Sequence, residues 1–443
     1  MLNILLSAGV SICGLEPYRS TVLISSLFYV LTLFPLRRFL GMFLTPLQAA
    51  WGCLFYITAP KLIRFSVSGL IDSGRNFFLI AALLLLFQLR EKPKIGSAVL
   101  FGLSLAGLSV SRGEELIFAI GILAGLPVLT LLKSTGLSRQ EFGKRAAAAG
   151  IAALVFLAVV SPFCAVNAYY TGYFITDVRF VEALCGKPSQ ALQDQPQAAV
   201  RETTVPKNED HLASAISNMI RGGYELYWVF SAIGMILLCW KRRWQWEHTV
   251  LIGIFLVHTV IYCKISSAYR YSIYLIPMFM PFTMTGLSFL SSMPEKLKWP
   301  ERLRLPAVGA VCVLLVLLFG FQIENGMKCV TERKDVWFRQ IADVISQWGR
   351  QHVPGRRVRL AAVGLGEIVY WSGADAVFRY KYGIRDLKSF RDFDLLLIPE
   401  SSAGDIAGRR DLRPIPLPEP PKRNRVHSDR VLLFCRQEFS EGK

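Results

Sequence analysis

The amino-acid sequence predicts a mainly α-helical, polytopic membrane protein of about ten transmembrane helices, followed by a small C-terminal α/β soluble domain. Apolar residues make up 53% of its 443 residues and charged residues 19%, below the average of about 25% in soluble proteins. The apolar residues gather into long runs, and only the last quarter of the chain has a soluble composition. This pattern excludes an ordinary soluble enzyme, a disordered chain and a collagen-like fibre.

A transmembrane helix needs about 20 mainly apolar residues, or fewer when its ends reach the interface. The segments that meet this condition are residues 21–36, 43–59, 76–89, 97–110, 115–132, 147–165, 225–240, 248–263, 272–290 and 306–322. Residues 2–14 are apolar but too short to span comfortably. We therefore treat residues 1–20 as a membrane-surface helix or a truncated N-terminal element, and we place the transmembrane domain at 21–325.

The basic residues orient these segments. The formal net charge is +18, and most Lys and Arg residues lie at the ends of apolar runs. One set of alternate short loops is rich in them: Arg37, Arg38, Arg90, Lys92, Lys94, Lys133, Arg139, Lys144, Arg145, Lys241, Arg242, Arg243, Lys296, Lys298, Arg302 and Arg304. The positive-inside rule makes these loops cytoplasmic and places both the N-terminal region and the C-terminal tail outside. Because the cations do not cluster on a soluble surface, nucleic-acid binding is not predicted.

Two outer segments are long. Residues 166–224 form a polar loop, and residues 327–443 form the tail. In the tail, 335–350 has the apolar spacing of a helix, and the β-rich runs RVRLAAVGL, AVFRYKY, FDLLLIPE and RVLLFCRQ follow. Residues 412–425 are a Pro-rich connection that is expected to be extended. The tail therefore predicts a small α/β domain.

Four short clusters place polar or aromatic groups at the outer ends of apolar runs. They are residues 60–76, 109–115, 161–174 and 263–272. Charges at membrane depth are costly, so they are functional candidates by default. Arg and Lys suit a phosphate, and the aromatic side chains suit a lipid chain or a sugar ring. The third cluster begins at Pro162, which is expected to end a helix.

Each member also has a purely structural interpretation. Lys264 and Arg270 fit interfacial anchors. Arg112 with a neighbouring glutamate fits a local ion pair, and Asp72 fits the cap of a helix that begins near Arg75. The aromatics fit an interfacial belt. The joint occurrence of the four clusters on one side carries more weight than any single member.

Other motifs are weak. The nine Cys residues are scattered without a Cys-x-x-Cys pair, which argues against a zinc site or a disulfide framework. The Gly364–Glu367 stretch lacks the third glycine of a dinucleotide fingerprint, so a nucleotide site is rejected. The five His residues have no ligand spacing, and His258 is interpreted as a packed core residue. No metal site and no cofactor are predicted, although a divalent metal is compatible with the outer carboxylates.

Four stretches, in this order and spacing, resemble the GT-C glycosyltransferases. They are CGLEPYRSTVLISSLFYVLTLFPLRRFLG, PKLIRFSVSGLIDSGRNFFLIAALLLLF, FGLSLAGLSVSRGEELIFAIGILAGL and AYRYSIYLIPMFMPF. Within this superfamily they resemble the dolichyl-phosphate-mannose–protein mannosyltransferases and their bacterial relatives, the lipid A aminoarabinose transferases. The resemblance covers most of residues 10–325.

This resemblance implies transfer of a sugar from a polyprenyl-phosphate donor to a cell-envelope acceptor (lipid, glycan or protein) at the outer face of a bacterial inner membrane. The donor-phosphate candidates are Lys61, Arg112, Lys264 and Arg270. The weaker catalytic or orienting candidates are Asp72, Glu114 and Glu115. Tyr269 and Tyr271 would line the lipid or sugar pocket, and the loop 166–224 would cover it. The expected partners are membrane lipid, the donor and the acceptor.

One feature departs from the family pattern. The main catalytic acid of the family lies in the first outer loop, whereas no acidic residue precedes Glu16 in this sequence. We therefore expect this acid upstream of Met1, in a missing N-terminal segment. Two alternatives stay open: a catalytically degenerate scaffold or partner-dependent subunit, and a transporter of lipid-linked sugars. The absence of an internal repeat and the position of the polar residues at one surface argue against the transporter.

Overall fold

The structure is a computed structural model in which part of the chain is described. The described residues are 2–15, 17–67, 72–111, 115–132, 139–171, 216–217, 225–264, 272–296, 333–362, 368, 372, 374–378, 393–399, 411–418 and 431–436. The chain divides into two compact units, one containing the helices up to residue 296 and the other containing the elements from residue 333 onward. Each unit is described by itself below.

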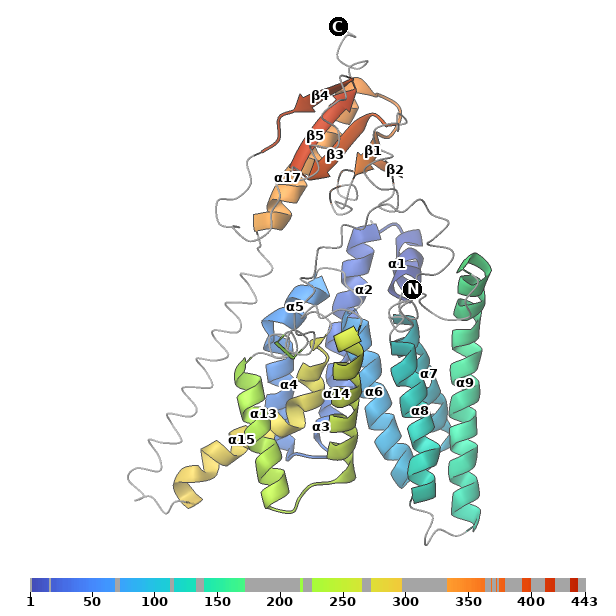
Figure 1. The fold of residues 1–443 in the computed structure, drawn as a ribbon, viewed down its shortest axis with the longest axis vertical. Coiled ribbons are helices and arrows are strands. Elements are labelled where there is room, and N and C mark those ends of the chain that lie inside the picture. Colours follow the sequence, from blue (N-terminus) through green and yellow to red (C-terminus); the bar gives the residue numbers. More distant parts are fainter. Residues whose placement is uncertain are drawn as a thin grey trace. The chain divides into compact units, whose positions relative to one another are not determined.

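The first unit is helical (Figure 1). Its helices are α1 (Leu2–Ile12), α2 (Pro17–Leu31), α3 (Leu33–Leu40), α4 (Pro46–Thr58), α5 (Pro60–Val67), α6 (Asp72–Glu91), α7 (Ile95–Ser111), α8 (Glu115–Leu132), α9 (Arg139–Thr171), α13 (Glu225–Trp240), α14 (Trp246–Lys264) and α15 (Leu275–Lys296). Helices α6 to α9 pack against one another, and α13 packs along α15. The two predicted spans 115–132 and 225–240 coincide with α8 and α13, and the span 306–322 lies outside the described residues.

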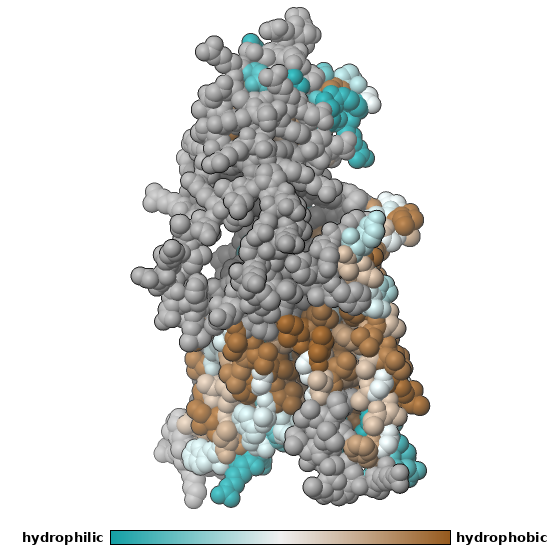
Figure 2. Space-filling view, turned by 45° about the vertical axis from the view of Figure 1, so that its right-hand side comes forward, coloured by the Kyte–Doolittle hydropathy of each residue, from teal (hydrophilic) through white to brown (hydrophobic). Residues whose placement is uncertain are grey.

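The apolar character of these helices is that of a membrane protein. Within the described part of the chain, the helices long and apolar enough to cross a bilayer are Arg19–Leu40, Asp72–Glu91 and Gln140–Tyr169, and five shorter apolar helices accompany them. Large hydrophobic side chains such as Phe34, Leu154 and Ile236 are exposed. On the face shown in Figure 2, hydrophobic side chains form a belt around the helical unit, as contact with lipid requires.

Helix α4 shows how the local sequence sets a helix start. Thr45 accepts a hydrogen bond from the Gln48 amide at 3.4 Å, and the Thr45 amide donates to Gln48 Oε1 at 3.0 Å. Pro46 occupies the first helical position, where no amide hydrogen is needed. This capping box satisfies two otherwise unpaired amides and fixes the start of α4.

Two predictions about helix boundaries were wrong. Pro162 does not end a helix, because it lies inside the continuous helix α9 and the surrounding turns maintain the helix. The same helix runs to Thr171, so the predicted loop 166–224 begins later. Residues 60–67 form α5, whose buried side, including Leu62 and Phe65, packs on its neighbours. The predicted span 21–36 lies within Arg19–Leu40, which is long and apolar enough to cross a bilayer, and it contains the junction of α2 and α3 at Thr32.

The second unit is a small α/β structure. It contains α17 (Arg333–His352) and the strands β1 (Arg359–Ala362), β2 (Asp375–Phe378), β3 (Leu395–Pro399), β4 (Leu412–Ile415) and β5 (Val431–Arg436). The sheet order is β2-β1-β3-β5-β4, with β1 parallel to β2 and β3, and with β5 antiparallel to β3 and β4. The first residues of the segment 412–425, which was predicted to be a Pro-rich connection, therefore form strand β4. Pro414 fits there because β4 is an edge strand.

A buried carboxylate ties the start of β3 to the segment before β1. Asp394 receives two hydrogen bonds from the Arg356 guanidinium, at 2.6 and 2.8 Å, and one from the Arg359 amide at 2.8 Å. Burial by itself would raise the pKa of Asp394, but these donors outweigh it and hold the pKa of this carboxyl below its ordinary value.

This lowered pKa predicts how the second unit responds to pH. Asp394 contributes stability above its unfolded pKa of about 3.9, and that contribution is lost as the pH falls through the folded pKa. Asp394→Asn should lower the stability of this unit by about 1–3 kcal/mol at pH 7, and the difference should shrink at pH 3. Hydrogen-exchange mass spectrometry of β3 and β5 in the full chain, with both proteins at the same pH, measures this difference in stability. The control Asp343→Asn changes an exposed carboxylate on α17 and should have little effect; an equal loss in both variants would contradict the prediction.

Candidate functional site

Four buried polar side chains meet where α6 and α8 begin, where α14 approaches its end, and just before α15. They are Arg75, Glu115, His258 and Tyr274, called here the Arg75 cluster. Arg75 Nη2 forms an ion pair with Glu115 Oε1, and both side chains are fully buried. The same nitrogen lies 3.4 Å from His258 Nε2, which is 3.8 Å from Glu115 Oε1. The cluster therefore joins residues that are far apart in the sequence, since Arg75 and His258 alone are separated by 183 positions.

The hydrogen bonds assign the protonation of His258. Its Nδ1 lies 3.2 Å from the carbonyl oxygen of Ile254. Because a carbonyl oxygen only accepts, Nδ1 carries the hydrogen, and Nε2 of the neutral ring accepts from Arg75. The ring stacks on Phe118 and contacts Tyr274, with 4.3 Å between the latter centroids. His258 is thus held in one orientation by groups on every side.

Two contacts stabilise the buried guanidinium of Arg75: the Glu115 carboxylate and the Tyr274 ring. Its guanidinium carbon lies 4.4 Å from the centroid of Tyr274, within the range of a cation–π interaction. A buried ion pair is tolerated when it is well hydrogen-bonded, and removal of one partner leaves an uncompensated charge. The cluster therefore fixes the ends of α6, α8 and α14 relative to Tyr274.

Other polar contacts join α2 to the start of α6 and to α5. Asp72 is the first residue of α6, fully buried and one helical turn before Arg75. Ser25 Oγ donates to Ser73 Oγ at 3.4 Å, and Ser26 Oγ donates to the carbonyl of Ser66 at 3.4 Å. The prediction that Asp72 caps a helix beginning near Arg75 was wrong, because the helix already includes Asp72.

The structure places the predicted site residues unequally. It brings Glu115 into the Arg75 cluster, while Lys61 lies half-buried on α5. Lys264 is the last residue of α14, and its side chain lies outside the described residues. The other candidates, Arg112, Glu114, Tyr269, Arg270 and Tyr271, also lie outside them.

These undescribed candidates are close to the Arg75 cluster along the chain. Residues 112–114 directly precede Glu115 and connect the end of α7 to the start of α8. Residues 265–271 follow α14 and end just before the buried Ser272. Both segments that carry candidate cations therefore lie close to the Arg75 cluster along the chain.

Sequence analysis underestimated three members of the cluster. Arg75 was recognised only as part of the charged stretch 60–76, and Tyr274 received no role. His258 is buried, as predicted for a packed residue, but its contacts are polar. The available signal was a polar residue inside an apolar span, which is a functional candidate by default. Among the described residues, no three His, Cys, Asp or Glu side chains are placed to hold a metal.

The arrangement of the helices defines the class of this protein: it has the fold of the GT-C glycosyltransferases, as the sequence resemblance predicted. It is similar to ArnT, a lipid A aminoarabinose transferase, from Cupriavidus metallidurans in the apo state (TM-score 0.58, 12% identity, 98% of this chain and 86% of ArnT). The same ArnT bound to undecaprenyl phosphate matches with a TM-score of 0.58, 11% identity and the same coverage.

A second similarity is to an archaeal oligosaccharyltransferase. AglB from Archaeoglobus fulgidus, in complex with an inhibitory peptide and a dolichol-phosphate, matches with a TM-score of 0.51 and 12% identity. The match covers 86% of this chain and 58% of AglB. No protein-family model and no curated protein sequence matches the chain. The relationship is therefore visible in the fold rather than in overall sequence identity.

Proposed function

We propose that this protein is a membrane glycosyltransferase that moves a sugar from a polyprenyl-phosphate donor to a cell-envelope acceptor. The observation that carries the proposal is the fold shared with ArnT, over 98% of this chain, in a complex that contains undecaprenyl phosphate. The Arg75 cluster supports it, because Glu115 and Tyr274 lie close in the chain to the segments in which the sequence concentrates cations and aromatic residues.

The proposed donor site uses cations for the phosphate. Arg112, Arg270, Lys61 and Lys264 would bind it, since charge develops on the phosphate as the sugar leaves. Tyr269 and Tyr271 would contact the sugar or the lipid chain. All six residues come from the polar clusters that the sequence places at the outer ends of apolar runs.

The carboxylates are assigned different tasks. Glu115 is proposed as a positioning residue, because its carboxylate is engaged with Arg75 and buried. Asp72 and Glu114 are proposed to orient the sugar or the acceptor. This division follows from charge, because a carboxylate already paired with a guanidinium is a weak base.

The proposed orientation follows the basic loops. Cations lie in the last turn of α3 and directly after α6 and α13, at the end opposite the Arg75 cluster, which favours a cytoplasmic location for that end. The Arg75 cluster, the transfer reaction and the C-terminal α/β domain would then be at the outer face of a bacterial inner membrane, with about ten transmembrane helices in all.

The donor site is tested with undecaprenyl phosphate as the probe. Arg270→Gln and Arg112→Gln should each weaken its binding about tenfold to a hundredfold, because each removes a charge-assisted hydrogen bond of about 1.5–3 kcal/mol. Native mass spectrometry or fluorescence titration of the full chain in nanodiscs measures the affinity. Lys92→Gln, an exposed cation in the α6–α7 turn, is the control and should bind as wild type.

A turnover assay separates a transferase from a scaffold. Wild-type protein is incubated with a panel of undecaprenyl-phosphate-linked sugars and an envelope extract, and released undecaprenyl phosphate is quantified. Release by wild type and its loss in Arg270→Gln are expected. Unchanged probe binding in both arginine variants, together with no release by wild type, would overturn the proposal in favour of a binding scaffold.

A further inference from the structure

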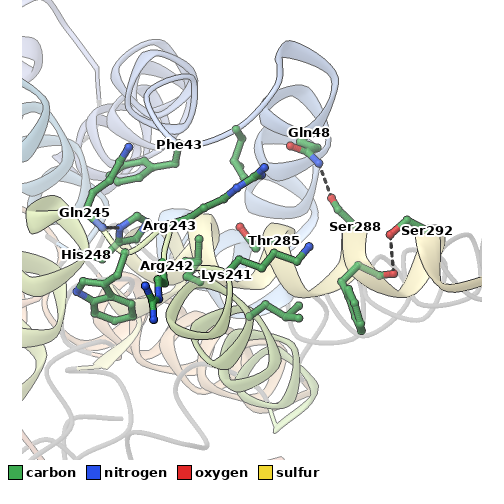
Figure 3. A pocket seen from close by; sticks show the side chains of 15 residues that line it. Phe43, Gln48, Lys241, Arg242, Arg243, Gln245, His248, Thr285, Ser288 and Ser292 are labelled. Carbon is green, nitrogen blue, oxygen red and sulfur yellow. Dashed lines mark hydrogen bonds between the residues drawn. The ribbon is translucent and has the colours of Figure 1, made fainter. Parts of the chain in front are cut away.

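A cavity of about 620 Å³ lies at the end of the first unit opposite the Arg75 cluster. It is lined by the turn between α13 and α14, the start of α4 and one side of α15. Figure 3 shows the side chains of the turn beside Gln48 of α4 and beside Thr285 and Ser288 of α15. Since α14 begins at this turn and carries His258 near its other end, the cavity is separate from the proposed donor site.

Three consecutive cations, Lys241, Arg242 and Arg243, line this cavity, and no acidic residue is among its described lining residues. The remaining wall combines hydroxyls with apolar groups. Gln48 Nε2 donates to Ser288 Oγ at 2.6 Å, and Ser288 Oγ donates to the carbonyl of Met284 at 2.8 Å. Lys241 Nζ lies 5.7 Å from the centroid of Phe289. Cations beside apolar side chains suit a ligand that has both a phosphate and acyl chains.

The backbone of the turn is strained at the central cation. Arg242 has a φ of 52°, in the left-handed region that favours glycine. The Arg243 amide donates to the Leu238 carbonyl at 2.9 Å, and the Arg242 amide donates to that of Cys239 at 3.1 Å. These are the two hydrogen bonds of a Schellman motif, in which glycine is the usual residue at the position of Arg242. Strain of this kind is typical of functional sites, and it implies a use for the Arg242 side chain.

We propose that this cavity binds the phosphate headgroup of an anionic phospholipid. Its volume is in the range of small-molecule sites and exceeds the need of a phosphate ion alone. Basic pockets between transmembrane helices on the cytoplasmic side suit anionic headgroups, and anionic lipids concentrate at that leaflet. The bound lipid would hold the α13–α14 turn against α4 and α15.

The test compares lipids and variants in the full-length protein. Native mass spectrometry in detergent, with added phosphatidylglycerol or phosphatidylcholine, measures the affinity. Wild type should prefer phosphatidylglycerol, and Lys241→Gln/Arg243→Gln should lose at least tenfold in affinity, since two charge-assisted contacts are removed. The matched control Arg38→Gln/Lys92→Gln removes two exposed cations from the same end, outside the cavity, and should lose less than about twofold.

The variant Arg242→Gly separates ligand binding from folding. Glycine relieves the left-handed strain, so the variant should unfold at a higher temperature than wild type, yet bind phosphatidylglycerol several-fold more weakly. A stabilised Arg242→Gly with unchanged lipid affinity would overturn the proposal, as would equal losses in the cavity and control double variants. A further arm adds inorganic phosphate or glycerol 1-phosphate; displacement of the lipid at equal concentration would identify a soluble phosphate as the ligand and overturn the lipid assignment.

Discussion

Glu115→Gln is expected to lower the free energy of unfolding by about 3–5 kcal/mol, because the fully buried Arg75 keeps its charge and loses its counter-charge. The prediction rests on the loss of the Glu115 carboxylate, because His258 and Tyr274, which also contact Arg75, do not replace its negative charge. Reversible unfolding of the full chain in mixed micelles, at increasing fractions of dodecyl sulfate, measures the loss.

Two further variants test the physical reason. Arg75→Met/Glu115→Leu removes both charges and is expected to recover most of the stability, because replacing a buried ion pair by apolar residues is often neutral or stabilising. Glu247→Gln breaks the partly exposed Arg90–Glu247 pair, whose closest atoms are 3.3 Å apart, and should cost about 1 kcal/mol or less. Equal losses in Glu115→Gln and Glu247→Gln would show that the Arg75 cluster does not hold the helices together.

Gly286→Ala is expected to destabilise the protein by about 1–3 kcal/mol through a backbone collision. A Cβ at Gly286 would overlap the carbonyl oxygen of Phe230, and one at Gly234 would overlap that of Phe282. The two glycines thus let α13 and α15 approach closely, which is how small residues promote packing between membrane helices. Thermal unfolding in detergent measures the effect, and Gly234→Ala should behave alike.

The matched control is Gly253→Ala on α14. A Cβ there meets no atom within 4 Å, so the higher helix propensity of alanine should leave stability unchanged or raise it by up to about 1 kcal/mol. Equal stability of Gly286→Ala and Gly253→Ala would contradict the inference that α13 and α15 approach closely at Gly286.

Much of the fold was predictable because apolar runs are a local property. The boundaries of α8 and α13 coincide with the apolar segments, and the helix expected at 335–350 is the core of α17. The predictions failed where tertiary contacts override local preferences. Pro162 stays inside α9, and the short helix α5 forms because its apolar side packs on its neighbours.

Less of the candidate site was predictable. Sequence analysis located the charges at the ends of apolar runs, and Glu115 among them, because such charges are visible in the sequence. It did not identify the partner of Glu115. Arg75 and His258 are separated by 183 positions, and nothing in either local sequence indicates that they meet.

The sequence by itself determined that this is a helical membrane protein with a GT-C-like order of motifs, since hydrophobic length and charge placement act locally along the chain. Only the tertiary structure decided that Arg75, Glu115, His258 and Tyr274 share one buried cluster, and that the Lys241–Arg243 turn lines a cavity. The physical reason is that an ion pair or a cavity depends on which helix faces meet, and helix packing is set by contacts between distant residues rather than by the composition of any one segment.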